Sequence, residues 1–181
     1  MKSTKQRTAM MVRIWHPLIR IIHWSLVAIF IANYFVLEAG SDWHQWLGYA
    51  AVALIAVRII WGFIDPGFGN FKTVHLSQAA IKSHFSHLKQ RHLPIKSGHN
   101  PLGWLMVFAV IALFTGLGVT GFMMEEIDAL FGNSTLEEVH GWLADILYAA
   151  AIVHVVAILI TGWRGRIELI RPMITGKRRV R

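Results

Sequence analysis

The sequence predicts an all-α protein, an integral membrane four-helix bundle with both termini in the cytoplasm. Three observations support this prediction. The chain is strongly apolar, with 55% hydrophobic residues among 181 and a mean hydropathy of +0.48. Four apolar runs are each about 20 residues long, the length that crosses a hydrocarbon core of about 30 Å. Basic and acidic residues alternate between the segments that flank and connect these runs.

The predicted spans cover residues 18–37, 44–64, 101–124 and 138–162. Each must be a helix, because a single segment in lipid has to satisfy its backbone hydrogen bonds internally. Four buried helices of a soluble core are a poor alternative, since too little polar chain remains to cover them. The first run is longer than the apolar part of a signal peptide, so we expect a permanent helix. The whole chain, 1–181, is expected to form one transmembrane domain.

The charged residues indicate the orientation. All 18 Lys and Arg residues lie within residues 2–20, 58–96 and 164–181. The connections between the first and second spans and between the third and fourth spans have acidic residues as their only charged residues. Because cytoplasmic segments are enriched in Lys and Arg, both termini and the loop 65–100 are placed in the cytoplasm. The same alternation explains the net charge of +8 without nucleic acid as a partner. The basic segments are expected to contact anionic membrane lipid.

The segments on the cytoplasmic side also contain local signals. Residues 1–13 are expected to form a mobile polar arm. In the long loop, residues 76–89 place Ile81, Phe85 and Leu88 on one helical face, which predicts a short helix on the membrane surface.

Helix starts are indicated by two further patterns. Pro101 suits the first turn of the third span. Thr135 and Glu138 have the spacing of a capping box, so the fourth helix is expected to begin beside Thr135. Within the third span, the glycines from Gly116 to Gly121 predict a close approach of another helix or of a macrocycle to the backbone.

Four histidines fall at two depths of the predicted bundle. His140 and His154 share the fourth span, where 14 residues separate them. That spacing puts them about 21 Å apart along the axis and about 40° apart around it. His23 in the first span is at the depth of His154, and His44 at the start of the second span is at the depth of His140. The sequence therefore predicts two pairs, His23/His154 and His44/His140.

Neutral imidazoles on facing helices are well suited to hold a haem iron from both sides. The chain has no cysteine, which excludes thiolate ligands and covalent c-type attachment. Two pairs thus predict two non-covalent haem b groups, one towards each side of the membrane, with all four histidines as axial ligands of iron. A single membrane histidine can instead hydrogen-bond a neighbouring helix, but two depth-matched pairs are harder to explain in that way.

Two arginines are expected to support the inner pair. Arg20 precedes His23 by three residues on the same helical face, and Arg58 follows His44 by 14 residues on the same stripe. Haem propionates are anions that favour guanidinium partners. Arg20 and Arg58 are therefore predicted to bind the propionates of the inner haem, although each could instead extend to the membrane surface.

Six further histidines are expected in cytoplasmic or interfacial positions: His16, His75, His84, His87, His92 and His99. The spacing of His84 and His87 would permit a shared metal ion, but a solvated helix face is the simpler interpretation.

The segments Val12-RIWHPLIRIIHW-Ser25, His44-QWLGY, Arg58-IIWG, Gly98-HNPLG and Glu138-VHGWLAD…IVH resemble the bacterial cytochrome b-561 family. That family includes the cytochrome b subunits of membrane nickel–iron hydrogenases. The resemblance extends from about residue 12 to residue 176. It implies a four-helix protein of the bacterial inner membrane with two b haems, and the family's ligand positions match His23, His44, His140 and His154.

The resemblance also implies a function. It implies electron transfer between the quinone pool and a redox partner, such as a periplasmic c-type cytochrome or a peripheral dehydrogenase subunit. A second hypothesis is a superoxide oxidase that reduces quinone, but the acidic outer rim would repel the anionic substrate. A third is a haem-free membrane scaffold or metal transporter.

Overall fold

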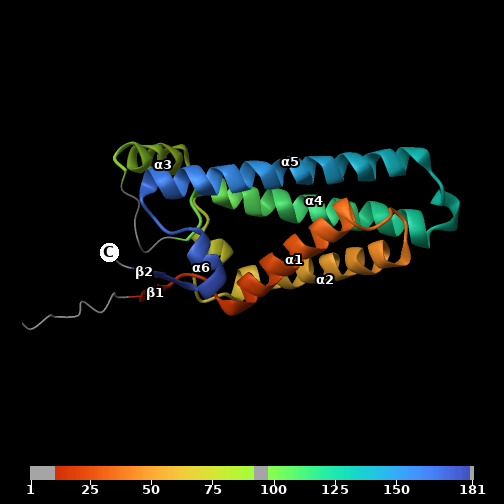
Figure 1. The fold of residues 1–181 in the computed structure, drawn as a ribbon, viewed down its shortest axis with the longest axis horizontal. Helices are drawn as coiled ribbons and strands as arrows, with labels where there is room; N and C mark the ends of the chain where they lie inside the picture. Colours follow the sequence, from red (N-terminus) through yellow and green to blue (C-terminus); the bar gives the residue numbers. More distant parts are fainter. Residues whose placement is uncertain (1–10, 92–97, 180–181) are drawn as a thin grey trace, which may run out of the picture.

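The structure is a computed structural model that describes residues 11–91 and 98–179. Four long helices run along its long axis (Figure 1): α1 (Pro17–Phe35), α2 (Asp42–Ile64), α4 (Pro101–Glu126) and α5 (Ser134–Gly165). All four are long and apolar enough to cross a membrane. Many of their apolar side chains face outward; Val153, for example, is 59% exposed. The protein is therefore a multi-pass membrane helical bundle.

The two ends of the bundle differ in charge. One end holds both described termini, the helices α3 (Gln78–Lys89) and α6 (Ile170–Thr175), and most of the Lys and Arg residues; we call it the basic end (Figure 1). The other end holds the short α1–α2 and α4–α5 connections. It exposes the carboxylates of Glu38, Asp42, Glu125, Glu126, Asp128, Glu137 and Glu138, and we call it the acidic end.

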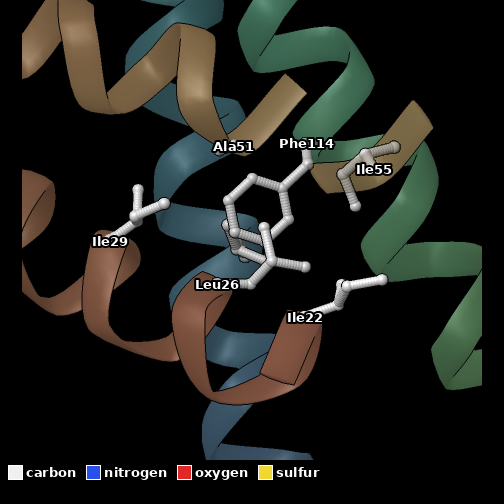
Figure 2. Packing of buried hydrophobic residues seen from close by; sticks show 7 residues of the cluster. Ile22, Leu26, Ile29, Ala51, Ile55 and Phe114 are labelled. Atoms are coloured by element: carbon white, nitrogen blue, oxygen red, sulfur yellow. The ribbon is translucent and has the colours of Figure 1, made fainter. Parts of the chain in front are cut away.

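The hydrophobic core lies between these ends and joins all four long helices. Its buried members are Ile22, Leu26 and Ile29 of α1, Ala51 and Ile55 of α2, Phe114 of α4 and Leu147 of α5. Figure 2 shows the ring of Phe114 beside Leu26 at the centre of this cluster. Because lipid tails are as apolar as these side chains, the cluster stabilises the bundle through packing rather than through exclusion of water.

Side-chain caps begin the long helices. Pro101 occupies the first turn of α4, as predicted, and Asn100 caps that helix through its side-chain oxygen. The predicted capping box at Thr135 is wrong. Gly132 has a positive φ of 69°, which turns the chain so that the Asn133 side chain accepts a hydrogen bond from the Leu136 amide, and α5 begins at Ser134.

The described termini are joined at the basic end, which the sequence did not predict. Strand β1 (Met11–Arg13) pairs antiparallel with β2 (Lys177–Arg179). Gly176, with a φ of 79°, links α6 to β2, and its carbonyl accepts a hydrogen bond from the Ile14 amide at 2.8 Å. The expected polar arm is therefore wrong for residues 11–13, and residues 1–10 lie outside the described residues.

The loop between α2 and α4 contains the predicted short helix, α3. Phe85 is 54% exposed, which suits a side chain that faces the membrane surface, and His84 is buried against the protein. Nε2 of His84 lies 3.1 Å from Nδ2 of Asn100, which ties α3 to the start of α4. Two short 3₁₀ helices, Phe71–Thr73 and Asp128–Leu130, complete the described connections.

Candidate functional site

The structure brings four histidines together as two pairs. The ring centroids of His23 and His154 are 6.3 Å apart at the basic end, and those of His44 and His140 are 6.2 Å apart at the acidic end. A first-row metal ion lies about 2 Å from an imidazole nitrogen, which itself lies about 1 Å from its ring centre. Two imidazoles on opposite sides of one ion therefore have ring centres about 6 Å apart. Both pairs have this separation.

The donor set favours haem over a bare metal ion. Within residues 11–91 and 98–179, no group of three or more His, Asp or Glu side chains lies close enough to hold a metal ion. Structural and catalytic zinc sites use three or four protein ligands. Two axial imidazoles are instead sufficient for an iron whose other positions are filled by a porphyrin.

The helices that carry each pair leave space between them. In the described chain, close packing joins α1 to α2, α2 to α4 and α4 to α5, and α5 does not pack as closely on α1 or α2. An open groove of about 270 Å³ lies on the surface between α1 and α5. Its lining consists of Phe30, Tyr148, Ala151, Ile152, Val155 and Val156. None of the four paired histidines lines this groove, so the looser packing of α5 on α1 and α2, rather than the groove, is what suits a flat macrocycle between these helices.

Thr120 of α4 orients the imidazole of His140. Its Oγ1 lies 2.8 Å from Nδ1 of His140 and donates a hydrogen bond to the Gly116 carbonyl at 2.9 Å. The hydroxyl oxygen therefore accepts from Nδ1–H of His140, and Nε2 keeps its lone pair. A ligating histidine commonly has its other ring nitrogen held in this way. The sequence alone did not single out Thr120.

The glycines of α4 have the predicted effect of allowing close approach. A Cβ at Gly118 would overlap with Val52 of α2, and one at Gly116 would lie 3.1 Å from Leu143 of α5. The glycines therefore bring α4 against its two neighbouring helices. Helix α4 in this way supports both helices of the acidic-end pair.

Both predicted arginines lie at the basic end. The Arg58 side chain is buried, and its Nη2 donates to the Gly69 carbonyl at 3.3 Å. Nη2 of Arg20 donates to the Ile174 carbonyl at 2.6 Å. Neither guanidinium has an acidic partner, because the single ion pair among the described residues joins Arg171 and Glu168. A buried cation without an ion pair is costly, which favours an anion beside it.

Two other histidines are less exposed than the sequence predicted. His84 is buried rather than on a solvated face, and burial, reinforced by the nearby His87, lowers its pKa. His99 is half-buried between Trp15 and Trp104, with ring centroids 4.6 and 4.8 Å away. Apolar periodicity could not have found these positions, because their partners come from distant segments.

Comparison with known proteins decides the family. A model of the family described as prokaryotic cytochrome b561 matches residues 14–176, which include all four paired histidines. The chain belongs to this family. This cytochrome b561 is thus a membrane b-type cytochrome that binds haem b and acts in electron transfer. Comparisons with curated proteins and with solved structures found no match.

Proposed function

We propose that this cytochrome b561 carries two haem b groups and transfers electrons between the quinone pool and a redox partner. His23 and His154 would hold one haem, and His44 and His140 the other. When bound, haem iron supplies one-electron redox chemistry. The protein's own contribution is to place the two imidazole pairs at opposite ends of one bundle.

The observation that supports this proposal most strongly is the geometry of the pairs. Both ring separations, 6.3 and 6.2 Å, suit a single ion between two imidazoles. Thr120 leaves Nε2 of His140 available as a ligand. The buried Arg58 and the neighbouring Arg20 suit the anionic propionates of a haem at the basic end.

The charges support an orientation and a kind of partner. The basic end would face the cytoplasm of a bacterial inner membrane, because Lys and Arg concentrate on that side. The acidic end would then face the periplasm. Its exposed carboxylates suit a soluble redox partner with a basic surface, such as a c-type cytochrome or a peripheral dehydrogenase subunit.

Haem stoichiometry tests the two sites. We expect about two haems per chain by pyridine haemochrome, and about one after either His140→Ala or His154→Ala. His75→Ala is the matched control, because His75 is exposed and bonds only the nearby Thr73 carbonyl. One haem in the unaltered protein, or loss of the same haem in both variants, would contradict the proposal.

Electron transfer is tested with the two expected partners. A soluble quinol should reduce the haems, and an oxidised c-type cytochrome should then reoxidise them. If electrons flow in the other direction, a reduced c-type cytochrome should reduce the haems. Absorbance in the haem α band follows both steps. Failure of every quinone analogue to exchange electrons with the protein would exclude the quinone-linked function.

A further inference from the structure

Several buried nitrogen atoms at the basic end have no hydrogen-bond partner. Within the described residues, these atoms are Nε of Arg20, Nη1 of Arg58, Nε1 of Trp61 and Nδ1 of His99. A buried donor left unsatisfied costs about 1–3 kcal/mol, and more when it is charged. Four of them in one region indicate that an acceptor belongs there.

These side chains converge on the region beside the basic-end pair. Arg20 lies one turn before His23 on α1, and Arg58 and Trp61 are one turn apart on α2. Trp61 packs against the buried cluster of Ile14, Trp15 and Ile19. The ring of His99 also contacts Trp15, and Arg20 and Trp15 both border Gly176, so Arg20, Trp61 and His99 all adjoin this cluster.

His99 can act as a neutral hydrogen-bond donor. Burial lowers the pKa of His99 to about 3, and the charges of Arg58, His154 and His23 contribute in that order. His99 is therefore neutral at physiological pH. A neutral imidazole with its proton on Nδ1 donates one hydrogen bond from the atom that has no partner.

The acidic residue whose charge acts on Arg58 is Asp65, and only one of its two carboxylate oxygens is engaged in a hydrogen bond. The Asp65 side chain is buried, and its Oδ2 accepts a hydrogen bond from the Gly69 amide at 2.8 Å. It makes no ion pair with Arg58. Asp65 thus fixes the turn whose Gly69 carbonyl positions Arg58, while Nη1 of Arg58 and Oδ1 of Asp65 both remain without a hydrogen-bond partner.

We propose that His99 and Trp61, together with Arg20 and Arg58, bind the two propionates of the basic-end haem. This inference rests on the proposed di-haem function and adds two neutral donors to the arginines. Two guanidinium groups match the charge of two carboxylates, and the indole and imidazole N–H groups supply further hydrogen bonds to their oxygens. The four side chains come from α1, α2 and the segment that precedes α4.

The test uses substitutions that remove the N–H but keep the ring. In His99→Phe and Trp61→Phe, each hydrogen bond to a carboxylate is lost while aromatic packing is retained. Such a bond is strong enough that we expect one haem to leave for apomyoglobin about tenfold faster in each variant. The midpoint potential of that haem should fall, because the propionates become more electron-rich, and the other haem should be unchanged.

Controls separate this role from a general structural one. Trp46→Phe and His75→Phe alter an exposed tryptophan and an exposed histidine that are not among the four proposed propionate donors, and they should leave both haems unaffected. His99→Gln retains an N–H donor and should preserve more of the original release rate than His99→Phe. His154→Ala identifies which redox wave belongs to the basic end.

The outcomes also distinguish the two proposals. Fewer than two haems in the unaltered protein would end the di-haem proposal itself. Two haems with unchanged release rates and unchanged potentials in His99→Phe and Trp61→Phe would overturn only the proposal that His99 and Trp61 bind the propionates. Equal effects on both haems would also overturn it, because a loss of general stability would explain them.

Discussion

The two histidine pairs have nearly the same geometry but different surroundings. Their ring separations are 6.3 and 6.2 Å, so the distance between the imidazoles does not distinguish them. The basic-end pair has two unpaired guanidinium groups nearby. The acidic-end pair has the hydroxyl of Thr120 and exposed carboxylates. Under the di-haem proposal, the two pairs would hold iron alike, and their surroundings would give the two haems different electronic properties.

This difference has a consequence for reduction potentials. Haem potentials depend on ligand type and on the charges and hydrogen bonds around the site. Because the proposed ligand pairs are the same, any difference between the two haem potentials would come from the surrounding charges and hydrogen bonds. Cations favour the reduced iron and anions the oxidised iron, so the basic-end haem is expected to have the higher potential. Electron transfer from the acidic end to the basic end would then be favourable.

The largest expected effect tests the hydroxyl at the acidic end. Thr120→Val keeps the shape of the side chain but removes the hydrogen bond to His140. Loss of such a supporting bond typically weakens metal binding about 10–100-fold. Haem titration of the apoprotein should show weaker binding at the acidic end alone. Thr115→Val, also on α4 but bonded only to the backbone, is the control. Equal weakening of both sites would show that Thr120 acts on the whole bundle.

Arg58→Met tests the cation at the basic end. Removing a buried guanidinium that makes no ion pair relieves a desolvation cost of several kcal/mol, so the apoprotein should become more stable. The same change should weaken binding of the basic-end haem about tenfold. Thermal unfolding with and without haem measures both effects. A less stable apoprotein would mean that Arg58 contributes chiefly through its bond to Gly69.

Neutralising the acidic end should slow the reaction with a basic partner. Glu125→Gln, Asp128→Asn and Glu137→Gln together remove three exposed carboxylates. Electrostatic steering typically changes association rates by about tenfold or more, and the change shrinks as salt screens the charges. Stopped-flow mixing with a basic c-type cytochrome at two salt concentrations measures this. An unchanged rate would place the docking surface elsewhere, and exposed Lys177→Gln serves as the control.

The smallest expected effect concerns pH at the basic end. The pKa of His84 lies below its ordinary value of 6.5, mainly because of burial, so the folded state favours the neutral ring. Stability from this group is complete above that value and decreases as the pH falls below it. The protection factors of the α3 amides, which correct for the intrinsic pH dependence of exchange, should therefore fall between pH 7.5 and pH 5, and His84→Gln should abolish that fall. Protection factors that are independent of pH in the unaltered protein would rule this out.

The sequence predicted the membrane helices well, because hydropathy decides them. The expected span 101–124 corresponds to Pro101–Glu126, and the span 44–64 corresponds to Asp42–Ile64. The structure also brings together the histidines that were matched by depth. Helical periodicity was sufficient for this, since His140 and His154 share one uninterrupted helix. Their role as haem ligands stays a prediction.

The features that sequence reasoning missed depend on contacts between distant segments. Strands β1 and β2 have three residues each, too few for a detectable alternation, and they exist only through pairing between opposite ends of the chain. His84 was assigned to a solvated face because its partner Asn100 follows much later. Thr120 carries no local signal, because a membrane threonine often bonds its own helix.

Helix α5 contributes one imidazole to each pair and is a single helix of 32 residues. The axial spacing between His140 and His154 is therefore set by the repeat of one helix. Movements of α1 or α2 would reorient the partner imidazoles without changing this spacing. Inserting one residue between His140 and His154 would rotate one imidazole by about 100° and break its pair. Changes in the lengths of the connections at either end would leave this phase unchanged, because both histidines lie within one helix.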